Sequence, residues 1–497
     1  MTRSRGLRGV VAETIAPRDL ECSRSGLRWC RSSVSLPMSR LEFDLLGRPY
    51  ARGYGAALSG FSNRATKVYV RLHLGHLYSA TITGAEPVGL ESAQAQPFEP
   101  TMGQWRDVVR PAIEAQCREL ADLATQPLEV ALRRAAELFE ECIMIHHQLL
   151  LPARRTVELF LDSTVDRDGQ ESLPFAVLAL LGVDLPLLQA GCRLLATGNS
   201  TVDISFTSHL GSVAPDGDGY GVAVGGWLDD PQYGRCMKAF YDRSGVTRVA
   251  VERRVRHGMR RRHIAELVLA SPNAHHSPTE FRSAIGSVRD ALELTECHGP
   301  LMHAVYIHHL RSLVMAHGER LADVLPRPGD IVHLSQPELA SGCLPSQREI
   351  VERRREFDAA CDSPLPPAEL RFVVEDGVPV GSSLDLSNYS EEGRIWRGLP
   401  GSPGLAEGRL VTVRRPSAID HVTGADVVLV PDPGAVWGWL GLGVRALLVE
   451  GGQRLSHVAT AARELGIPCV LGCAGLGSVA PEGRTVRVDG RRGLVAW

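Results

Sequence analysis

The stretch Glu450–Gly472, EGGQRLSHVATAARELGIPCVLG, decides how the C-terminal part of the chain is predicted to fold. Ser456 is a hydroxyl residue of the kind that precedes helices, and the apolar spacing after it predicts a helix over His457–Leu465. Gly466 stops that helix and Pro468 prevents its continuation. The sequence therefore predicts a glycine turn, then a helix that begins with a histidine, then a strand.

His457 is predicted to lie where a phosphoryl group can be held. The first turn of a helix offers unpaired N–H groups and the positive end of the helix dipole, which stabilise an anion by about 0.3–1 kcal/mol near the surface. Gly451 and Gly452 let the backbone approach closely. An imidazole with a pKa of about 6.5 is partly neutral and nucleophilic near neutral pH. A histidine at a helix start is usually a cap or a surface residue, so the flanking pattern has to support the catalytic interpretation.

That flanking pattern resembles the swivelling phosphohistidine domain of the PEP-utilising enzymes, a family that includes pyruvate phosphate dikinase, PEP synthase, rifampin phosphotransferase and phenylphosphate synthase. The matching positions are Ser456, His457, Ala459, Ala462, Arg463, Glu464, Gly466, Pro468, Val470 and Gly472. Neighbouring segments look like the opening strand and turn (Gly398–Val413), the next strand (Ala425–Pro433) and the closing hairpin (Glu482–Val495) of that domain. Gln453 departs from the pattern, because the family has its second glycine there unless one residue is inserted; a side chain at this place would crowd the phosphate or hydrogen-bond to it.

The resemblance implies phosphoryl transfer through a covalent intermediate on His457. The residues predicted to contact the phosphate are Gly452, Arg454, Ser456 and Arg463. Arg463 has a second interpretation as a residue of the helix surface. The phosphoramidate nitrogen leaves well once the ring is reprotonated, so catalysis would consist mainly of positioning and charge stabilisation.

The composition indicates a soluble protein with about two or three domains in 497 residues. The net charge of -3 argues against nucleic acid as the main partner. One basic run, Val251–His263, either attracts a phosphorylated domain or an acidic substrate, or is simply a solvated helix face. The eleven cysteines show neither metal-ligand spacing nor the density of a disulfide scaffold, so no metal site is predicted, and Cys469 and Cys473 are expected in the core.

Neither end of the chain nor its interior predicts a membrane segment. The first 26 residues are polar and arginine-rich, without the apolar core of a signal peptide. The longest apolar stretch, Leu173–Ala196, is interrupted by charged residues and prolines. A cytoplasmic location without membrane contact is therefore expected.

The chain is predicted to be an α+β protein in which a large, mainly helical acceptor-type domain precedes a β/α swivelling domain. We expect a loose tail over 1–26, a substrate- or acceptor-binding domain over 27–379, a linker over 380–397 and the phosphohistidine domain over 398–497. Two short strands about a Gly-His turn are predicted in Val68–Thr83. Helical spacing of apolar residues occurs in Trp105–Leu123, Leu128–Leu150, Arg282–Glu296, Leu301–Leu321 and Gln347–Cys361.

Segments before the linker resemble other parts of rifampin phosphotransferase and its PEP synthase relatives. Pro326–Gly342 and Arg348–Cys361 look like the passage "DxFxLxxxEL … RRxEF", with Val332 in place of its phenylalanine, and Trp29–Gly47 looks like the start of the drug-binding domain. Phe206–Gly211 and Trp227–Pro231 occupy the places of a "YGHR…E" element and its tryptophan, but the arginine and the glutamate are missing. This departure leaves the substrate chemistry open.

An acceptor hydroxyl needs a base, and His209 in the glycine-rich stretch Phe206–Asp230 is the candidate. Other histidines remain as alternatives: His73, His76, His303, His308 and His309. Neighbouring histidines on a helix point about 100° apart, so His308 and His309 do not chelate a metal together readily.

The sequence shows no glycine-rich nucleotide loop, Walker A motif or barrel-like alternation of strands and helices. No cofactor bound by the chain itself is therefore expected, and ATP with Mg, or PEP, is expected to act as an indirect donor. The family precedent of phenylphosphate synthase, whose components lie on separate chains, implies a separate ATP-grasp partner and a small hydroxylated acceptor such as a natural product or antibiotic. Two alternatives stay open: a non-catalytic phosphohistidine carrier or regulatory protein, and an enzyme component that phosphorylates a hydroxyl for later elimination.

Overall fold

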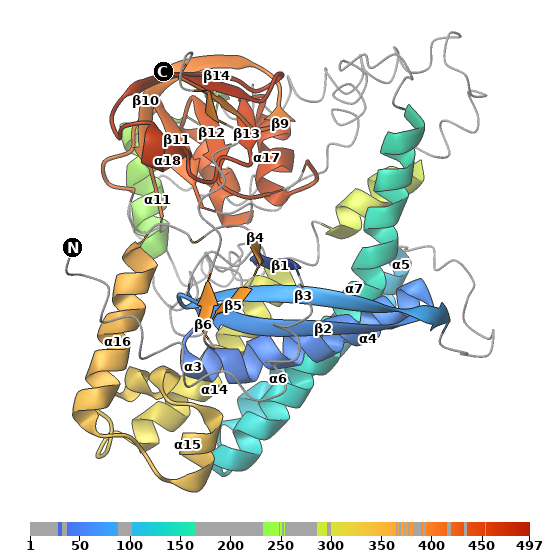
Figure 1. The fold of residues 1–497 in the computed structure, drawn as a ribbon, viewed down its shortest axis with the longest axis vertical. Coiled ribbons are helices and arrows are strands. Elements are labelled where there is room, and N and C mark those ends of the chain that lie inside the picture. Colours follow the sequence, from blue (N-terminus) through green and yellow to red (C-terminus); the bar gives the residue numbers. More distant parts are fainter. Residues whose placement is uncertain are drawn as a thin grey trace.

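The fold is taken from a computed structural model of the chain. It combines many helices with β-sheets (Figure 1), so the prediction of an α+β protein is confirmed. The structure describes residues 28–31, 37–87, 102–164, 232–247, 249–250, 253, 286–295, 300–363, 366, 369–371, 373–375, 378–380, 389–390, 394–414, 419–431, 435–452 and 454–497.

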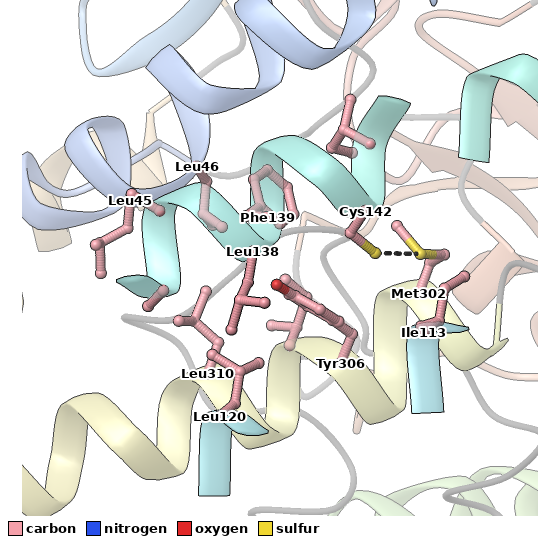
Figure 2. Packing of buried hydrophobic residues seen from close by; sticks show 14 of the residues in the cluster. Leu45, Leu46, Ile113, Leu120, Leu138, Phe139, Cys142, Met302, Tyr306 and Leu310 are labelled. Atoms are coloured by element: carbon pink, nitrogen blue, oxygen red, sulfur yellow. Dashed lines mark hydrogen bonds between the residues drawn. The ribbon is translucent and has the colours of Figure 1, made fainter. Parts of the chain in front are cut away.

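Long helices of the N-terminal part pack around one apolar core. They are α4 (Arg48–Ser62), α6 (Arg110–Leu123), α7 (Leu128–Thr164), α14 (Ile307–Arg320) and α16 (Gln347–Asp362). Figure 2 shows Phe139 and Cys142 of α7 beside Tyr306 and Met302, with 3.3 Å between the sulfur atoms of Cys142 and Met302. None of the helices in the described ranges is both long enough and apolar enough to span a membrane.

The predicted helices are present, with differences at their ends. The segments Trp105–Leu123 and Leu301–Leu321 begin as π-helical turns, η2 (Trp105–Val109) and η3 (Pro300–Tyr306), before α6 and α14 follow. The prediction that the second helix ends at Leu150 was wrong, since α7 continues through Pro152 to Thr164. Beyond the proline, Ala153, Val157 and Phe160 remain buried in the helical core, and this packing outweighs the one backbone hydrogen bond that the proline removes.

A four-stranded antiparallel sheet lies against these helices, with the strand order β2-β3-β1-β4. Its strands are β1 (Arg28–Arg31), β2 (Arg64–His73), β3 (His76–Pro87) and β4 (Glu369–Arg371). The predicted hairpin is confirmed, but its strands are longer than expected and its turn is Leu74–Gly75 rather than Gly-His. Both turn residues have positive φ, 51° and 81°, and His76 already pairs with His73 across the hairpin.

The C-terminal sheet has the strand order β7-β8-β15-β14-β10-β11-β12-β13-β9. Its strands are β7 (Tyr389–Ser390), β8 (Ile395–Arg397), β9 (Leu399–Ser402), β10 (Leu405–Thr412), β11 (Asp426–Val430), β12 (Ala446–Val449), β13 (Cys469–Leu471), β14 (Thr485–Asp489) and β15 (Leu494–Ala496). Strands β10 to β13 are parallel neighbours, and β11 and β12 are buried along their whole length, as expected for strands covered on both faces. The predicted opening segment contains two strands, β9 and β10, where one strand and a turn were expected. The predicted next strand (β11) and closing hairpin (β14 and β15) are confirmed. The range predicted as a linker contributes β7 and β8 to this sheet.

Apolar side chains are buried on both faces of the C-terminal sheet. One face packs against α17 (His457–Leu465) and the 3-10 helix η5 (Ala435–Leu442). On the other face, Leu476 of the short helix α18 (Leu476–Val479) and Trp396 of β8 are buried with the strand residues. The helix α11 (Gln232–Arg243), from the middle of the chain, joins the first face (Figure 1, green). Its Phe240 and Tyr241 are fully buried in the core of the C-terminal domain, although residues 27–379 were predicted as one acceptor domain.

The passage that resembles "DxFxLxxxEL … RRxEF" forms the helices η4 (Pro328–His333), α15 (Gln336–Ser341) and α16. Ion pairs connect α16 with the other two helices. Arg354 lies 2.7 Å from the buried carboxylate of Asp330, and Arg353 lies 2.9 Å from Glu338. Val332, in the place of the family's phenylalanine, is buried in the helical core. The acidic and basic positions of this passage therefore pair with one another and have a structural explanation.

Candidate functional site

His457 is the first residue of α17, and the predicted limits of this helix are confirmed. Gly466 follows the helix in the left-handed conformation, with φ of 66°. Ser456 occupies the N-cap position, as predicted, but its side chain makes no capping hydrogen bond. Its Oγ atom is buried without a hydrogen-bond partner, because the hydroxyl does not reach back to the N–H groups of the first turn. A hydroxyl and an imidazole therefore adjoin at the positive end of this helix.

The helix is fixed firmly to the sheet. All residues from Val458 to Leu465 are buried, and Ala461 lies so close to Gly438 of η5 that a side chain on that glycine would touch it at 3.0 Å. The hydroxyl of Thr460 donates to the carbonyl of Ser456 at 3.1 Å. His457 itself is half-buried, so it remains accessible at the end of an otherwise buried helix.

Glycines shape the loop before His457. Gly452 has φ of 99°, which other residues rarely adopt. The carbonyl of Gly451 accepts a hydrogen bond from the N–H of Gly472 at 3.3 Å, so the loop is joined to the end of β13. Gln453, the departure from the family pattern, lies outside the described residues.

Arg463 is 9% exposed and makes hydrogen bonds within the domain. Its Nη1 donates to the carbonyl of Gly401 at 2.9 Å and to the carbonyl of Arg454 at 2.8 Å, and its Nη2 donates to Thr460 at 3.0 Å. These contacts give it a structural role that the sequence did not indicate, and its predicted contact with phosphate stays a prediction. The side chain of Arg454 is exposed beside the same loop.

An ion pair that sequence reasoning missed lies at the start of the loop. Glu450 is 5% exposed, and its carboxylate is 3.5 Å from Nη2 of Arg414, which follows β10. These two residues are 36 positions apart in the chain, so only the parallel order of the strands brings them together. A buried carboxylate and its arginine thus stand directly before the glycines that lead to His457.

The His457 loop contacts the N-terminal part of the molecule. Leu455, two residues before His457, packs against the apolar core formed by the long helices. Arg414 is close enough to His76 of β3 for its positive charge to help lower the pKa of that histidine. The described structure therefore holds the His457 loop against the helical part and its four-stranded sheet.

The remaining predicted residues are scattered. His209 and the glycine-rich stretch around it lie outside the described residues, as does the basic run apart from the exposed Arg253. His308 and His309 are neighbours on α14, with ring centroids 5.7 Å apart. Cys469 and Cys473 are fully buried core thiols, as predicted; burial raises the pKa of Cys469 to about 12 and raises that of Cys473 as well.

Some known proteins are similar to the C-terminal part of this chain, and another is similar to most of it. A family model described as PEP-utilising enzyme, mobile domain, matches residues 424–493. Phosphoenolpyruvate synthase of Pyrococcus furiosus is 39% identical over 103 residues, which cover 20% of this chain and 12% of that protein. Chondramide synthase cmdD of Chondromyces crocatus is 24% identical over 540 residues, which cover 92% of this chain and 13% of that protein.

An uncharacterised protein of Mycobacterium tuberculosis is 29% identical over 200 residues, which cover 39% of this chain and 22% of that protein. The chain thus spans only a small part of the length of these relatives. The matched residues 424–493 include the His457 loop, α17 and four strands of the C-terminal sheet, β11 to β14. The C-terminal domain, with His457 at the start of its buried helix, is similar to the mobile domain of the PEP-utilising enzymes.

Proposed function

We propose that this chain is a phosphotransferase component that carries a phosphoryl group on His457 and passes it to a hydroxyl of a small molecule. The observation that carries the proposal is the position of His457: it is half-exposed at the N-terminus of a buried helix, in a segment that matches the mobile domain. The N–H groups and the dipole of that helix end favour a negatively charged group on the imidazole.

The contact between the His457 loop and the helical part supports delivery to an acceptor bound there. Leu455 packs against the helical core, so the loop can present His457 to groups on that side of the molecule. A phosphoryl group that moves between a donor and this place needs a mobile carrier, and we propose that the C-terminal domain swivels between the two. The transfer itself would depend mainly on positioning and on neutralisation of the phosphoryl charge.

The donor in this proposal is a separate ATP-grasp protein that uses ATP with Mg, and PEP is the alternative donor. A cytoplasmic location, where both compounds occur, belongs to the same proposal. Phospho-transfer from a partner requires that His457 be reachable from outside, which agrees with its half-buried side chain.

The relative that covers most of the chain is named as a synthase of chondramide, and this supports a biosynthetic setting over a signalling one. A second candidate function, in which the hydroxyl is phosphorylated only to be eliminated, fits the same biosynthetic setting. The two are separated by the final product: transfer adds one phosphoryl mass to the acceptor, and elimination removes one water.

The decisive test is intact-mass and acid-lability analysis after incubation with ATP, with PEP, and with ATP plus a candidate ATP-grasp protein. We expect an acid-labile gain of one phosphoryl group that is absent in His457→Ala. His421→Ala is the matched control, because His421 is an exposed histidine of the same domain, and it should charge normally. A gain that persists in His457→Ala would contradict the proposal, and a charged protein that never transfers to any hydroxyl would favour the carrier function.

A further inference from the structure

One face of the four-stranded sheet gathers histidines and arginines. Residues directly opposite each other in an antiparallel pair share a face, and in this sheet Tyr78 of β3 pairs with Arg71 of β2 and with Arg31 of β1. His76 pairs with His73 and lies two residues from Tyr78, so both histidines are on the same face. We call these five residues the histidine–arginine face.

This face points away from the helical core. The alternate residues Val70, Leu72 and Leu77 belong to the other face, and they pack against the core of the long helices. Arg414 of the C-terminal domain is close enough to His76 of this face for its charge to act on that histidine. The histidine–arginine face is therefore turned toward the domain that carries His457.

His76 is buried in this face and has a strongly lowered pKa. It is only 2% exposed, and its Nδ1 has no hydrogen-bond partner. Burial lowers its pKa to about 3, helped by the positive charges of Arg31, His73 and Arg414. The ring is thus neutral near pH 7, and its Nδ1 is a buried polar atom that a ligand can satisfy.

Arg414 brings a residue of the C-terminal domain to the histidine–arginine face. It belongs to the C-terminal domain, where it pairs with Glu450 directly before the His457 loop, yet its charge acts on His76 of the sheet. Arg31 contributes a second guanidinium from β1. Two guanidinium groups suit a phosphoryl group, and a neutral imidazole nitrogen suits a hydroxyl.

We propose that the histidine–arginine face is the acceptor subsite, in which Nδ1 of His76 receives the proton of the acceptor hydroxyl while Arg31 and Arg414 bind the phosphoryl group. The ligand class is a small alcohol or phenol that becomes a phosphate monoester. This inference rests on the proposed function, because it assigns the place where the phosphoryl group of His457 is delivered.

Transfer to the acceptor exchanges one P–N bond for one P–O bond. The P–N bond on His457 breaks with its electron pair on the imidazole, a P–O bond forms to the acceptor oxygen, and the hydroxyl proton moves to His76. The departing imidazole takes up one proton from water, and His76 returns its proton to water, so no net proton is gained or lost. Arrival of the negatively charged phosphoryl group offsets the two arginine charges, which raises the pKa of His76 and makes it a better base at that moment.

The first experiment measures binding of inorganic phosphate to the uncharged full chain by calorimetry, together with the titration of the His76 ring by NMR of histidine-labelled protein. Phosphate should raise the pKa of His76, and Arg31→Gln and Arg414→Gln should each weaken phosphate binding by about tenfold. Arg31→Lys should retain most of the binding. Arg445→Gln is the matched control, because Arg445 is an exposed arginine of the C-terminal domain that bonds to the carbonyl of Glu407.

The second experiment measures hydrolysis of the phosphohistidine on His457, with water as the surrogate acceptor. His76→Asn keeps a hydrogen-bonding group near the position of Nδ1 but accepts no proton, so hydrolysis should slow by about tenfold or more, while charging of His457 should be unchanged. The control is His317→Gln, because His317 is also 2% exposed with an unpartnered ring nitrogen, but lies on α14 in the helical part.

Phosphate binding that is absent in the unmodified chain, or unchanged in both Gln variants, overturns the subsite. So does hydrolysis that is as fast in His76→Asn as in the unmodified chain. Both results leave the proposed function intact as long as His457 becomes phosphorylated. Absence of the phosphohistidine would instead defeat the proposed function, and the phosphate-binding arm would still decide whether the face binds anions.

Discussion

Nη1 of Arg463 lies 2.9 Å from the carbonyl oxygen of Gly401, and this hydrogen bond joins the helix of His457 to the edge strand β9. The same nitrogen lies 2.8 Å from the carbonyl of Arg454 in the loop before the histidine. One guanidinium group thus fixes three separate segments around the site. A charged group that is 9% exposed must have such partners, since burial without them is strongly unfavourable.

Replacement of Arg463 by Gln should therefore lower the free energy of unfolding by roughly 2–4 kcal/mol, because it removes the charge-assisted hydrogen bonds that this buried guanidinium group donates. Urea unfolding measures this change, and Arg445→Gln, at an exposed position, should stay within about 0.5 kcal/mol of the unmodified chain. If Arg463→Gln unfolds normally but no longer forms phosphohistidine, Arg463 acts on the phosphate instead.

The ion pair of Glu338 and Arg353 should make stability depend on pH. Partial burial raises the pKa of Glu338, but hydrogen bonds from Arg353 and Ser335 outweigh it and lower the pKa from 4.5 to about 2. A carboxylate with a lowered pKa contributes stability above its unfolded pKa, and this contribution is lost as the pH falls from about 4.5 toward 2.

Glu338→Gln should thus cost about 1–3 kcal/mol at pH 7 after allowance for the exposed part of the pair, and the difference from the unmodified chain should shrink as the pH falls through that window. Urea midpoints at pH 7, 5 and 3 test this expectation. Glu349→Gln is the control, since Glu349 pairs with the same arginine but its side chain is 52% exposed. A constant difference across the pH range would show that the pKa of Glu338 is not lowered.

The sequence predicted those parts of the site that depend on neighbours in the chain. Ser456, Gly466 and Pro468 mark the ends of α17 by local conformational preference, and the apolar runs around it predict buried parallel strands. What could not be predicted depends on pairs that are far apart in sequence. The contact of Arg463 with Gly401 and the ion pair of Glu450 with Arg414 exist only because of the strand order.

The histidine–arginine face escaped sequence reasoning for a similar reason. A histidine in the hairpin was one of several alternatives, and nothing near His76 in the sequence indicates that Arg31 lies across from its neighbour Tyr78. The continuation of α7 past Pro152 is a case of tertiary packing that overrides a local signal.

Gly318 should not tolerate a side chain, although it lies inside a helix where alanine is normally preferred. A Cβ atom at this position would lie only 2.2 Å from the carbonyl oxygen of Pro328, which belongs to the backbone of η4. Gly318→Ala should therefore lower the free energy of unfolding by about 1–3 kcal/mol despite a helix-propensity gain of about 1 kcal/mol. Gly286→Ala, where a Cβ atom meets nothing within 4 Å, should be neutral or slightly stabilising in the same urea measurement. Equal behaviour of the two variants would contradict the close contact.

Leu455 should control how closely the C-terminal domain stays against the helical part. Its side chain packs on the helical core, so Leu455→Asp would place a charge in an apolar contact and favour separation of the two parts. Small-angle scattering should show a larger radius of gyration for this variant, while the charging of His457 from the donor should remain. Leu405→Asp is the matched control, because Leu405 is a leucine of the same domain that is 65% exposed, and its replacement should leave the radius unchanged. An unchanged radius of gyration in Leu455→Asp would mean that other contacts hold the two parts together. If hydrolysis of the phosphohistidine were slower in this variant but not in Leu405→Asp, the contact made by Leu455 would still be needed for phosphoryl transfer.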